Sequence, residues 1–288
     1  MLADWQVAKS SRNTILNKSE WQSEAGETWA AEWRRTDRSF NHLTERLLAT
    51  LRGLALTQVL DIGCGAGELS LAIARSHPEA DVVGLDVSPQ LIAVARERGS
   101  HLPNTSFVCE DAALWTAEPD FAPNLLISRH GVMFFDDPPI VFGNLAAQAA
   151  PGARLTFSCF RSPSDNPFFT DVLALLPQAP PPGDPLAPGP FAFADTARVQ
   201  GILEAGGWGD IGFTEVDFPM IAGVGEHAVE EAVEYFRMIG PAARAASEMD
   251  PAARIRFLDR VRELAERNLR KGVVSLSASA WIVTAHKR

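Results

Sequence analysis

Residues 59–67 read Val-Leu-Asp-Ile-Gly-Cys-Gly-Ala-Gly, and this stretch decides the fold. Its first four residues are mostly apolar, which predicts a buried strand. Gly63, Gly65 and Gly67 then alternate, and an amphipathic helical pattern follows at once. Glycine lets the backbone turn sharply and approach a ligand, and a helix N-terminus offers free N–H groups to anionic atoms. The stretch therefore predicts a nucleotide-sized crevice between a strand and a helix.

The spacing of these glycines separates the stretch from its commonest alternative. A dinucleotide-binding fingerprint, Gly-x-Gly-x-x-Gly, needs its third glycine at position 68, and that residue is Glu68. A nicotinamide-dependent oxidoreductase is therefore disfavoured. The pattern Asp61-x-Gly63-x-Gly65-x-Gly67 instead resembles the first motif of the class I S-adenosylmethionine (SAM) methyltransferases. The resemblance implies an enzyme that uses SAM and releases S-adenosylhomocysteine (SAH).

The composition excludes several classes of protein. With 288 residues, of which 46% are apolar, the chain can bury one large α/β core or one core with an insertion. Its net charge of −10 argues against a broad contact with nucleic acid or with an anionic membrane. Three scattered cysteines, and no signal-like or membrane-length apolar run, lead us to expect a reducing, cytoplasmic location.

Apolar runs and helical patterns alternate along the chain, which predicts a parallel sheet with right-handed crossovers. Ser88-Pro89 and Asp137-Pro138 each mark a helix start, with a capping residue before a proline. We expect an α/β fold with a doubly wound, seven-stranded, mostly parallel, Rossmann-like sheet. The methyltransferase resemblance implies the strand order 3-2-1-4-5-7-6, with the seventh strand antiparallel beside the fifth. The strands are expected at about 57–62, 81–86, 105–110, 124–129, 154–160, 211–218 and 276–285.

We expect three parts in the chain. Residues 1–56 form an N-terminal helical lid, residues 57–160 form the SAM-binding core, and residues 161–288 supply the last strands of the core. The third part also contains a proline-rich loop at 177–190 and a helical insertion at 226–270 before the last strand. We expect the lid and the insertion to cover the substrate.

The lid and the insertion each carry a distinctive feature. Trp21, Trp29 and Trp33 stand close together in the lid, where they either cover the cofactor or fasten the lid to the core. Aromatic faces stabilise cations by about 0.5–2 kcal/mol, so Trp33 is a candidate partner for the SAM sulfonium. In the insertion, Pro241 is expected to end a first helix and Asp250 to cap a second.

Acidic residues stand at the ends of the first three expected strands, where open α/β sheets bind ligands. The resemblance implies that Asp61 anchors the aminoacyl end of SAM while the glycines make room. Asp86 is placed to accept both ribose hydroxyls, since a carboxylate binds paired donors. The resemblance also implies that Asp111 accepts the adenine amine and that the N–H of Ala112 meets a ring nitrogen. Val87 is expected to pack on the adenine, and the alternative for each acid is an ordinary turn residue.

The fourth expected strand ends in Ser128, which we assign to the cofactor site, and delivers Arg129-His130-Gly131 to the same edge of the sheet. A neutral imidazole there can take a proton from a substrate hydroxyl or an activated carbon, which makes His130 the candidate catalytic residue. The equal alternative is that His130 lines the methionine part of SAM or caps a turn without acid–base work. No His, Cys or Asp cluster has the spacing of a metal site, so no metal is expected.

Further segments resemble one bacterial branch of the family, similar to the ubiquinone- and menaquinone-biosynthesis C-methyltransferases and related small-molecule enzymes. They are Gly26-x-x-Trp29, the run at 129–135 and Pro190-Phe-Ala-Phe193. The large variable cover indicates a small, apolar or aromatic acceptor, methylated on oxygen or carbon. The alternatives are an RNA- or protein-modifying methyltransferase and a non-catalytic SAM-binding regulator. The side chains expected near the acceptor are Phe168, Phe169, Phe191, Phe193, Phe236 and Met238, while helix spacing leaves the orientation of Tyr235 open.

Overall fold

The computed structural model describes residues 18–178, 184 and 186–288. Part of the expected lid (1–17) and part of the expected proline-rich loop (179–183 and 185) lie outside the described residues.

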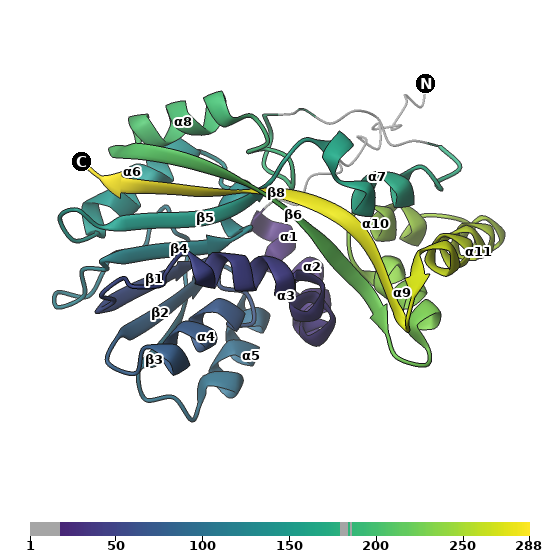
Figure 1. Cartoon of the computed structure of the whole chain (residues 1–288), viewed down its shortest axis with the longest axis horizontal. Coiled ribbons are helices and arrows are strands. Elements are labelled where there is room, and N and C mark those ends of the chain that lie inside the picture. Colours follow the sequence, from purple (N-terminus) through teal and green to yellow (C-terminus); the bar gives the residue numbers. More distant parts are fainter. Residues whose placement is uncertain (1–17, 179–183, 185) are drawn as a thin grey trace, which may run out of the picture.

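A mixed sheet organises the described chain, in the order β3-β2-β1-β4-β5-β8-β6 (Figure 1). Strands β1 to β5 are parallel, and β8 runs antiparallel between β5 and β6. The expected α/β fold and strand order are confirmed, because β8 takes the position expected for the seventh strand, between β5 and β6. A short extra strand, β7, pairs with β8. The central strands β1 and β4 are buried, as their apolar runs predict. The strands are β1 (Gln58–Ile62), β2 (Asp81–Asp86), β3 (Thr105–Cys109), β4 (Leu125–Arg129), β5 (Arg154–Phe160), β6 (Trp208–Val224), β7 (Leu269–Arg270) and β8 (Val273–Lys287).

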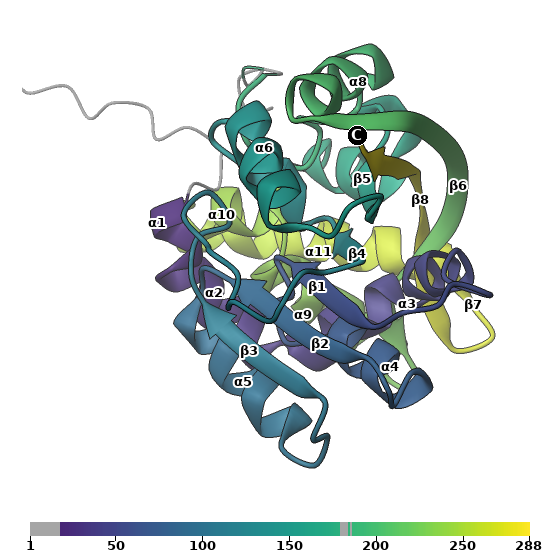
Figure 2. The ribbon, with the colours of Figure 1, turned by 90° about the vertical axis from the view of Figure 1, so that its left-hand side faces the viewer.

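Helices cover both faces of the parallel part of the sheet (Figure 2). Helices α3, α4 and α5 lie along one face, and α6 and α8 pack together on the other. Ser88, Asp137 and Asp250 each accept a hydrogen bond from a backbone N–H in the first turn of the helix that they precede, which confirms the expected helix starts. The helices are α1 (Lys18–Trp21), α2 (Glu24–Ala31), α3 (Trp33–Ala49), α4 (Glu68–Ser76), α5 (Pro89–Gly99), α6 (Pro138–Gln148), α7 (Pro167–Leu173), α8 (Thr196–Ala205), α9 (Ala228–Met238), α10 (Pro241–Ser247) and α11 (Pro251–Asn268), with 3-10 turns η1 (Gly131–Phe134) and η2 (Pro163–Asp165).

Strands β6 and β8 continue beyond the core as a two-stranded ribbon (Figure 1). Both are longer than expected, because they pair with each other from Trp208–Lys287 at one end to Val224–Val273 at the other. Pro219 is tolerated in β6 because this strand forms the edge of the sheet. Helices α7, α9 and α11 pack against the ribbon and bring the second half of the chain over the end of the sheet.

The expected pair of helices in the insertion is wrong in one respect, because the structure has three. Helix α9 already ends at Met238, and Pro241 occupies the first position of α10 rather than closing the helix before it. The restricted φ of proline suits a first helical residue, whose N–H needs no partner within the helix. Pro241 is therefore a helix start, whereas its place in the sequence had indicated a stop.

Candidate functional site

The turn between β1 and α4 has the geometry that its glycines predict. Gly63, Gly65 and Gly67 have φ values of 64°, 55° and 85°, in the left-handed region where side chains are strained. A Cβ added to Gly63 would lie 2.8 Å from the Cα of Gly131, which follows β4. The two turns therefore touch through their backbones and form one continuous surface at the carboxyl edge of the sheet.

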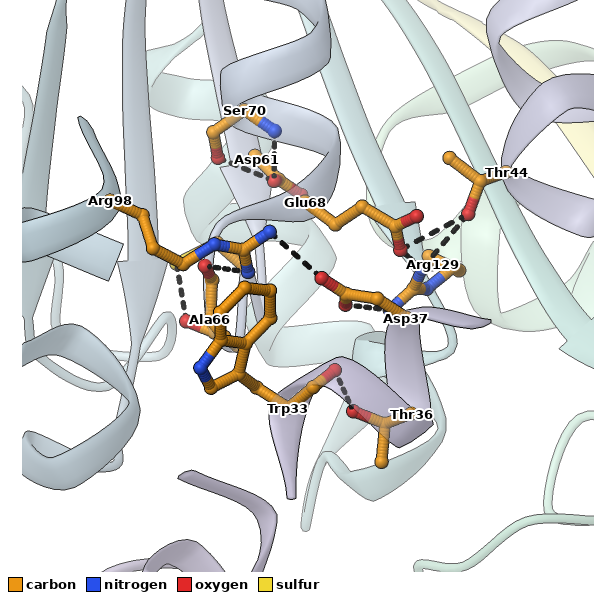
Figure 3. A network of polar contacts seen from close by, with 12 residues as sticks. Trp33, Thr36, Asp37, Thr44, Asp61, Ala66, Glu68, Ser70, Arg98 and Arg129 are labelled. Carbon is orange, nitrogen blue, oxygen red and sulfur yellow. Dashed lines mark hydrogen bonds and ion pairs between the residues drawn. The ribbon is translucent and has the colours of Figure 1, made fainter. Parts of the chain in front are cut away.

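Asp61 lies beneath this surface and is almost fully buried. Its Oδ2 accepts hydrogen bonds from the backbone N–H of Ser70 (3.1 Å) and from the Ser70 hydroxyl (2.6 Å), as Figure 3 shows. Burial raises the pKa of Asp61 to about 6, although the bonds from Ser70 and the charge of Arg129 act in the opposite direction. The carboxylate is thus held at a net cost to the folded chain.

Asp86 joins the turns that follow β1 and β2. One carboxylate oxygen accepts from the N–H of Gly65 (2.9 Å) and the other from the N–H of Ser88 (2.8 Å). Burial raises the pKa of Asp86 in spite of these bonds. Val87 follows Asp86 in the chain, and its carbonyl oxygen is 3.8 Å from the Cys109 sulfur. The structure therefore places Asp86 beside the glycine turn, and its role as the ribose partner stays a prediction.

Asp111, after β3, meets the N-terminal helices. Its carboxylate forms an ion pair with Lys18 of α1 and accepts a hydrogen bond from the N–H of Ala113 (2.9 Å). Partial burial acts to raise the pKa of Asp111, but Lys18 and the Ala113 N–H outweigh it and lower the pKa. Ala112 is buried, and its carbonyl accepts from the Asn144 side chain of α6 (2.9 Å). Lys18 is thus paired with the carboxylate that we expect to bind adenine.

Ser128 links the turns after β1 and β4, and its side chain points into the protein rather than into the candidate site. Its hydroxyl donates to the carbonyl of Ile62 (2.6 Å) and accepts from the N–H of Gly131 (3.1 Å). The side chain is fully buried. Ser128 therefore supports the contact between the two turns and has little capacity left for a cofactor.

Trp33 lies over the glycine turn, but a cation of the chain itself covers its ring (Figure 3). The guanidinium carbon of Arg98 is 3.7 Å from the ring centroid, and that of Arg34 is 4.4 Å away. Arg98 also donates to the carbonyl of Ala66 within the turn (2.6 Å). In this structure the tryptophan fastens α3 to the turn through Arg98, which is one of the two roles that the sequence left open for it. Its role as a partner of the sulfonium stays a prediction.

Four charged side chains, Asp37, Glu68, Arg98 and Arg129, form a charged network beside this tryptophan (Figure 3). Asp37 of α3 pairs with Arg98 (2.8 Å) and with Arg129 (3.6 Å), and Arg129 also pairs with Glu68, the first residue of α4. Thr44 accepts from Arg129 (2.8 Å). The sequence reasoning missed this network, because its members come from four elements far apart in the chain.

His130 follows β4 with a φ of 65°, which is uncommon for a residue with a side chain. Its ring stacks on Phe160, with centroids 4.1 Å apart, and meets Phe40 edge-on at 5.3 Å. Within the part of the chain that the structure describes, neither ring nitrogen has a hydrogen-bond partner. Burial, aided by the charge of Arg129, lowers the pKa of His130 to about 3. The imidazole is therefore neutral at physiological pH, and a base of this strength cannot take a proton from a hydroxyl efficiently.

Aromatic side chains gather around His130 from both halves of the chain. Ring contacts run from Phe160 through Phe169 (4.9 Å) to Phe168 (5.4 Å), and from Phe168 to Tyr235 of α9 (5.7 Å). Burial raises the pKa of Tyr235 to about 12. We call this set the aromatic cluster: Phe40, His130, Phe160, Phe168, Phe169, Phe191, Tyr235 and Phe236.

Other expected residues lie elsewhere. Phe193 packs on Phe142 and Phe157 in the core of the sheet. Trp21 and Trp29 contact each other, with centroids 5.3 Å apart. Among residues 18–178, 184 and 186–288, no group of His, Cys, Asp and Glu side chains could hold a metal ion, and no helix could cross a membrane.

A family model described as a methyltransferase domain matches residues 59–152, which span β1 to the turn before β5. The trans-aconitate 2-methyltransferase of Variovorax paradoxus is 31% identical over 183 residues, 63% of this chain and 65% of that protein. The enzyme of the same name from Methylobacterium radiotolerans is 37% identical over 109 residues, 38% of this chain and 40% of that protein. Malonyl-[acyl-carrier protein] O-methyltransferase 1 of Ilyobacter polytropus is 28% identical over 120 residues, 41% of this chain and 44% of that protein.

The chain thus matches between 40% and 65% of the length of these relatives. Their names do not single out the quinone-biosynthesis branch that the sequence resembled. Among solved structures, Haemonchus contortus phosphoethanolamine N-methyltransferase 2 in complex with SAM has a TM-score of 0.55 at 14% identity, over 95% of this chain and 61% of that chain. YcgJ from Bacillus subtilis has a TM-score of 0.53 at 16% identity, over 86% of this chain and 99% of that chain. These likenesses show the fold.

Proposed function

We propose that this chain, whose core is that of a class I SAM-dependent methyltransferase, transfers the methyl group of SAM to a carboxylate oxygen of a small organic acid with an apolar skeleton. The observation that carries the proposal is His130, a buried neutral imidazole among aromatic rings and next to the glycine turn. Its ring nitrogens have no hydrogen-bond partner among the residues that the structure describes.

The protonation state of His130 argues for an acceptor that arrives without a proton. SAM is already an activated electrophile, so alignment of the acceptor with its methyl group supplies most of the rate. A hydroxyl acceptor needs a base to lose its proton, and a histidine with a pKa of about 3 is poorly matched to that task. A carboxylate is already ionised at neutral pH and needs no base. His130 is therefore a positioning residue in this proposal, which donates one N–H to the acceptor.

On the donor side, the proposal keeps the roles expected for the glycine turn and for the acids at the ends of β1, β2 and β3, and gives no role to Ser128 or Trp33. The glycine turn leaves room for the aminoacyl end of SAM, whose ammonium group would compensate the buried charge of Asp61. Asp86 accepts the ribose hydroxyls with the lone pairs that Gly65 and Ser88 leave free. Asp111 and Ala112 receive the adenine, with Val87 packed against it, once Lys18 has released Asp111.

The acceptor side is the aromatic cluster, which suits an apolar carbon skeleton. The relatives add support for an acid: one is named for trans-aconitate, a carboxylate, and another for O-methylation of a malonyl group. Helices α1 to α3 act as the lid in this proposal. Lys18 ties α1 to the adenine side, and Arg98 ties α3 to the glycine turn, so the lid must move for SAM to enter.

Methyl transfer from SAM labelled in its methyl group tests the proposal. The full chain is incubated with matched pairs, such as cinnamate with cinnamyl alcohol and benzoate with phenol, and with trans-aconitate. We expect label in the acids, released as methanol by mild alkali, since carboxylate methyl esters hydrolyse and aryl or alkyl methyl ethers do not. Alkali-stable label would contradict the proposal in favour of phenol or carbon methylation. Tight SAH binding with no transfer to any acceptor would instead indicate a regulator.

A further inference from the structure

Arg129 has no role in the function proposed above, although its position is unusual. It is the last residue of β4, and its side chain is only 16% exposed. Burying a guanidinium is costly unless partners compensate the charge. Asp37, Glu68 and Thr44 supply these partners. Three polar partners thus keep a guanidinium buried beside the candidate site, where it can meet a ligand.

The guanidinium lies between the donor side and the aromatic cluster. On one side it pairs with Glu68, which directly follows the last glycine of the turn. On the other side its central carbon is 5.1 Å from the ring centroid of Phe40, and Phe40 contacts His130 at 5.3 Å. Its charge also acts on the hydroxyl of Tyr235. The positive charge of Arg129 thus lies close to the aromatic cluster, through Phe40 on one side and Tyr235 on the other.

The two acids that hold Arg129 are not equivalent. Asp37 is 2.8 Å from Arg98 and 3.6 Å from Arg129. Arg98 therefore compensates the charge of Asp37 even without Arg129. Glu68 has Arg129 and the neutral hydroxyl of Thr44 (3.3 Å) as partners. A carboxylate ligand matches the same planar fork and can replace Glu68 on it.

The charge balance sets when that exchange is favourable. In the charged network, Arg98 and Arg129 are balanced by Asp37 and Glu68. The SAM sulfonium places a positive charge at the reacting methyl group, and opposite charges attract more strongly in a buried site than in water. The sulfonium and Arg129 therefore both favour a carboxylate acceptor over a neutral one.

We propose that Arg129 determines the specificity of this site, by binding the carboxylate of the acceptor in place of Glu68 once the cofactor is bound. The inference rests on the proposed function, and names the residue that would select an anionic acceptor.

Calorimetric titration of the full chain with cinnamate and with cinnamyl alcohol tests the inference. The chain is saturated in one series with SAH, which has no charge at sulfur, and in the other with an unreactive SAM analogue that carries a positive charge in place of the sulfonium. Cinnamate should bind more tightly in the second series, and equal binding in both would refute the dependence on the cofactor charge. We expect Arg129→Gln to weaken cinnamate about 10- to 100-fold, as for the loss of a charged hydrogen bond, and to leave the alcohol unchanged. Glu68→Gln should tighten cinnamate, since it removes the competing carboxylate. The matched controls are Arg75→Gln and Glu79→Gln, two exposed side chains, and neither should alter binding.

Several outcomes would overturn the inference. If Arg129→Gln weakens the binding of SAH itself and changes the affinities for cinnamate and for the alcohol equally, the guanidinium binds the cofactor carboxylate instead. If Arg129→Gln fails to fold, judged by circular dichroism, Glu68→Gln decides, and unchanged cinnamate binding refutes the exchange. Failure of the proposed function looks different: cinnamate still binds in an Arg129-dependent way, but label from SAM never reaches an acid.

Discussion

Asp61→Asn is expected to stabilise the protein and to weaken its cofactor binding at the same time. Asp61 is 1% exposed, and burial raises its pKa from an ordinary value of 3.8 to about 6. At 1.36 kcal/mol for each pH unit, the ionised carboxylate costs the folded state about 3 kcal/mol. The asparagine carbonyl can take the place of Oδ2, which accepts both hydrogen bonds from Ser70. The substitution therefore removes the buried charge and keeps these bonds.

The gain in stability from Asp61→Asn depends on pH, which identifies the buried carboxylate as its source. Because the folded-state pKa is raised, the folded protein binds the proton more tightly, and this stability is lost as pH rises towards and through 6. Urea unfolding should show a gain for Asp61→Asn of about 3 kcal/mol at pH 8 and about 1 kcal/mol at pH 4.5. Asp81→Asn, at an exposed position in β2, is the matched control and should change little. A loss of stability at pH 8, or an equal gain at both pH values, would refute the reasoning.

Three further predictions concern the same site. Gly63→Ala should cost about 1–3 kcal/mol, because φ is 64° and the new Cβ would lie 2.8 Å from Gly131, and calorimetry should show that SAH binding is lost. Lys18→Ala should change the free energy of unfolding by less than about 1 kcal/mol, since this side chain is 40% exposed. The substitution should tighten SAH binding because it frees Asp111, and weaker SAH binding would contradict a competition between Lys18 and adenine for Asp111. With a carboxylate acceptor, kcat should show no ionisation of His130 between pH 6 and pH 9, because its pKa is about 3, and a limb near pH 6.5 that His130→Gln removes would contradict this.

Local signals in the sequence were enough to predict the glycine turn and the starts of several helices. The alternating glycines at 63, 65 and 67 predicted the turn, because left-handed φ values are a property of single residues. The caps at Ser88 and Asp137 predicted helix starts for the same reason. The strand order came from the family resemblance, since alternation of strands and helices alone does not order a sheet.

The parts that the sequence did not predict depend on partners far apart in the chain. Arg98 meets Ala66 and Asp37 only after α5, α4 and α3 have packed, and no spacing in the sequence encodes that meeting. For Trp33 the sequence left two roles open, and it did not indicate that Arg98 would cover the ring. The length of β6 and β8 was underestimated because their outer halves stabilise each other rather than the core.

The most direct test of the proposed cofactor site is a crystal structure of the full chain with SAH. We predict the ribose hydroxyls on Asp86, the aminoacyl end over the turn at 63–67, and the sulfur directed towards His130 and the aromatic cluster. The Lys18–Asp111 pair should be open, with adenine beside Asp111. SAH bound elsewhere, for example in the cleft of about 600 Å³ lined by Arg161 and Asp217 on the ribbon, would contradict this placement. So would a cofactor sulfur separated from His130 by the body of the sheet.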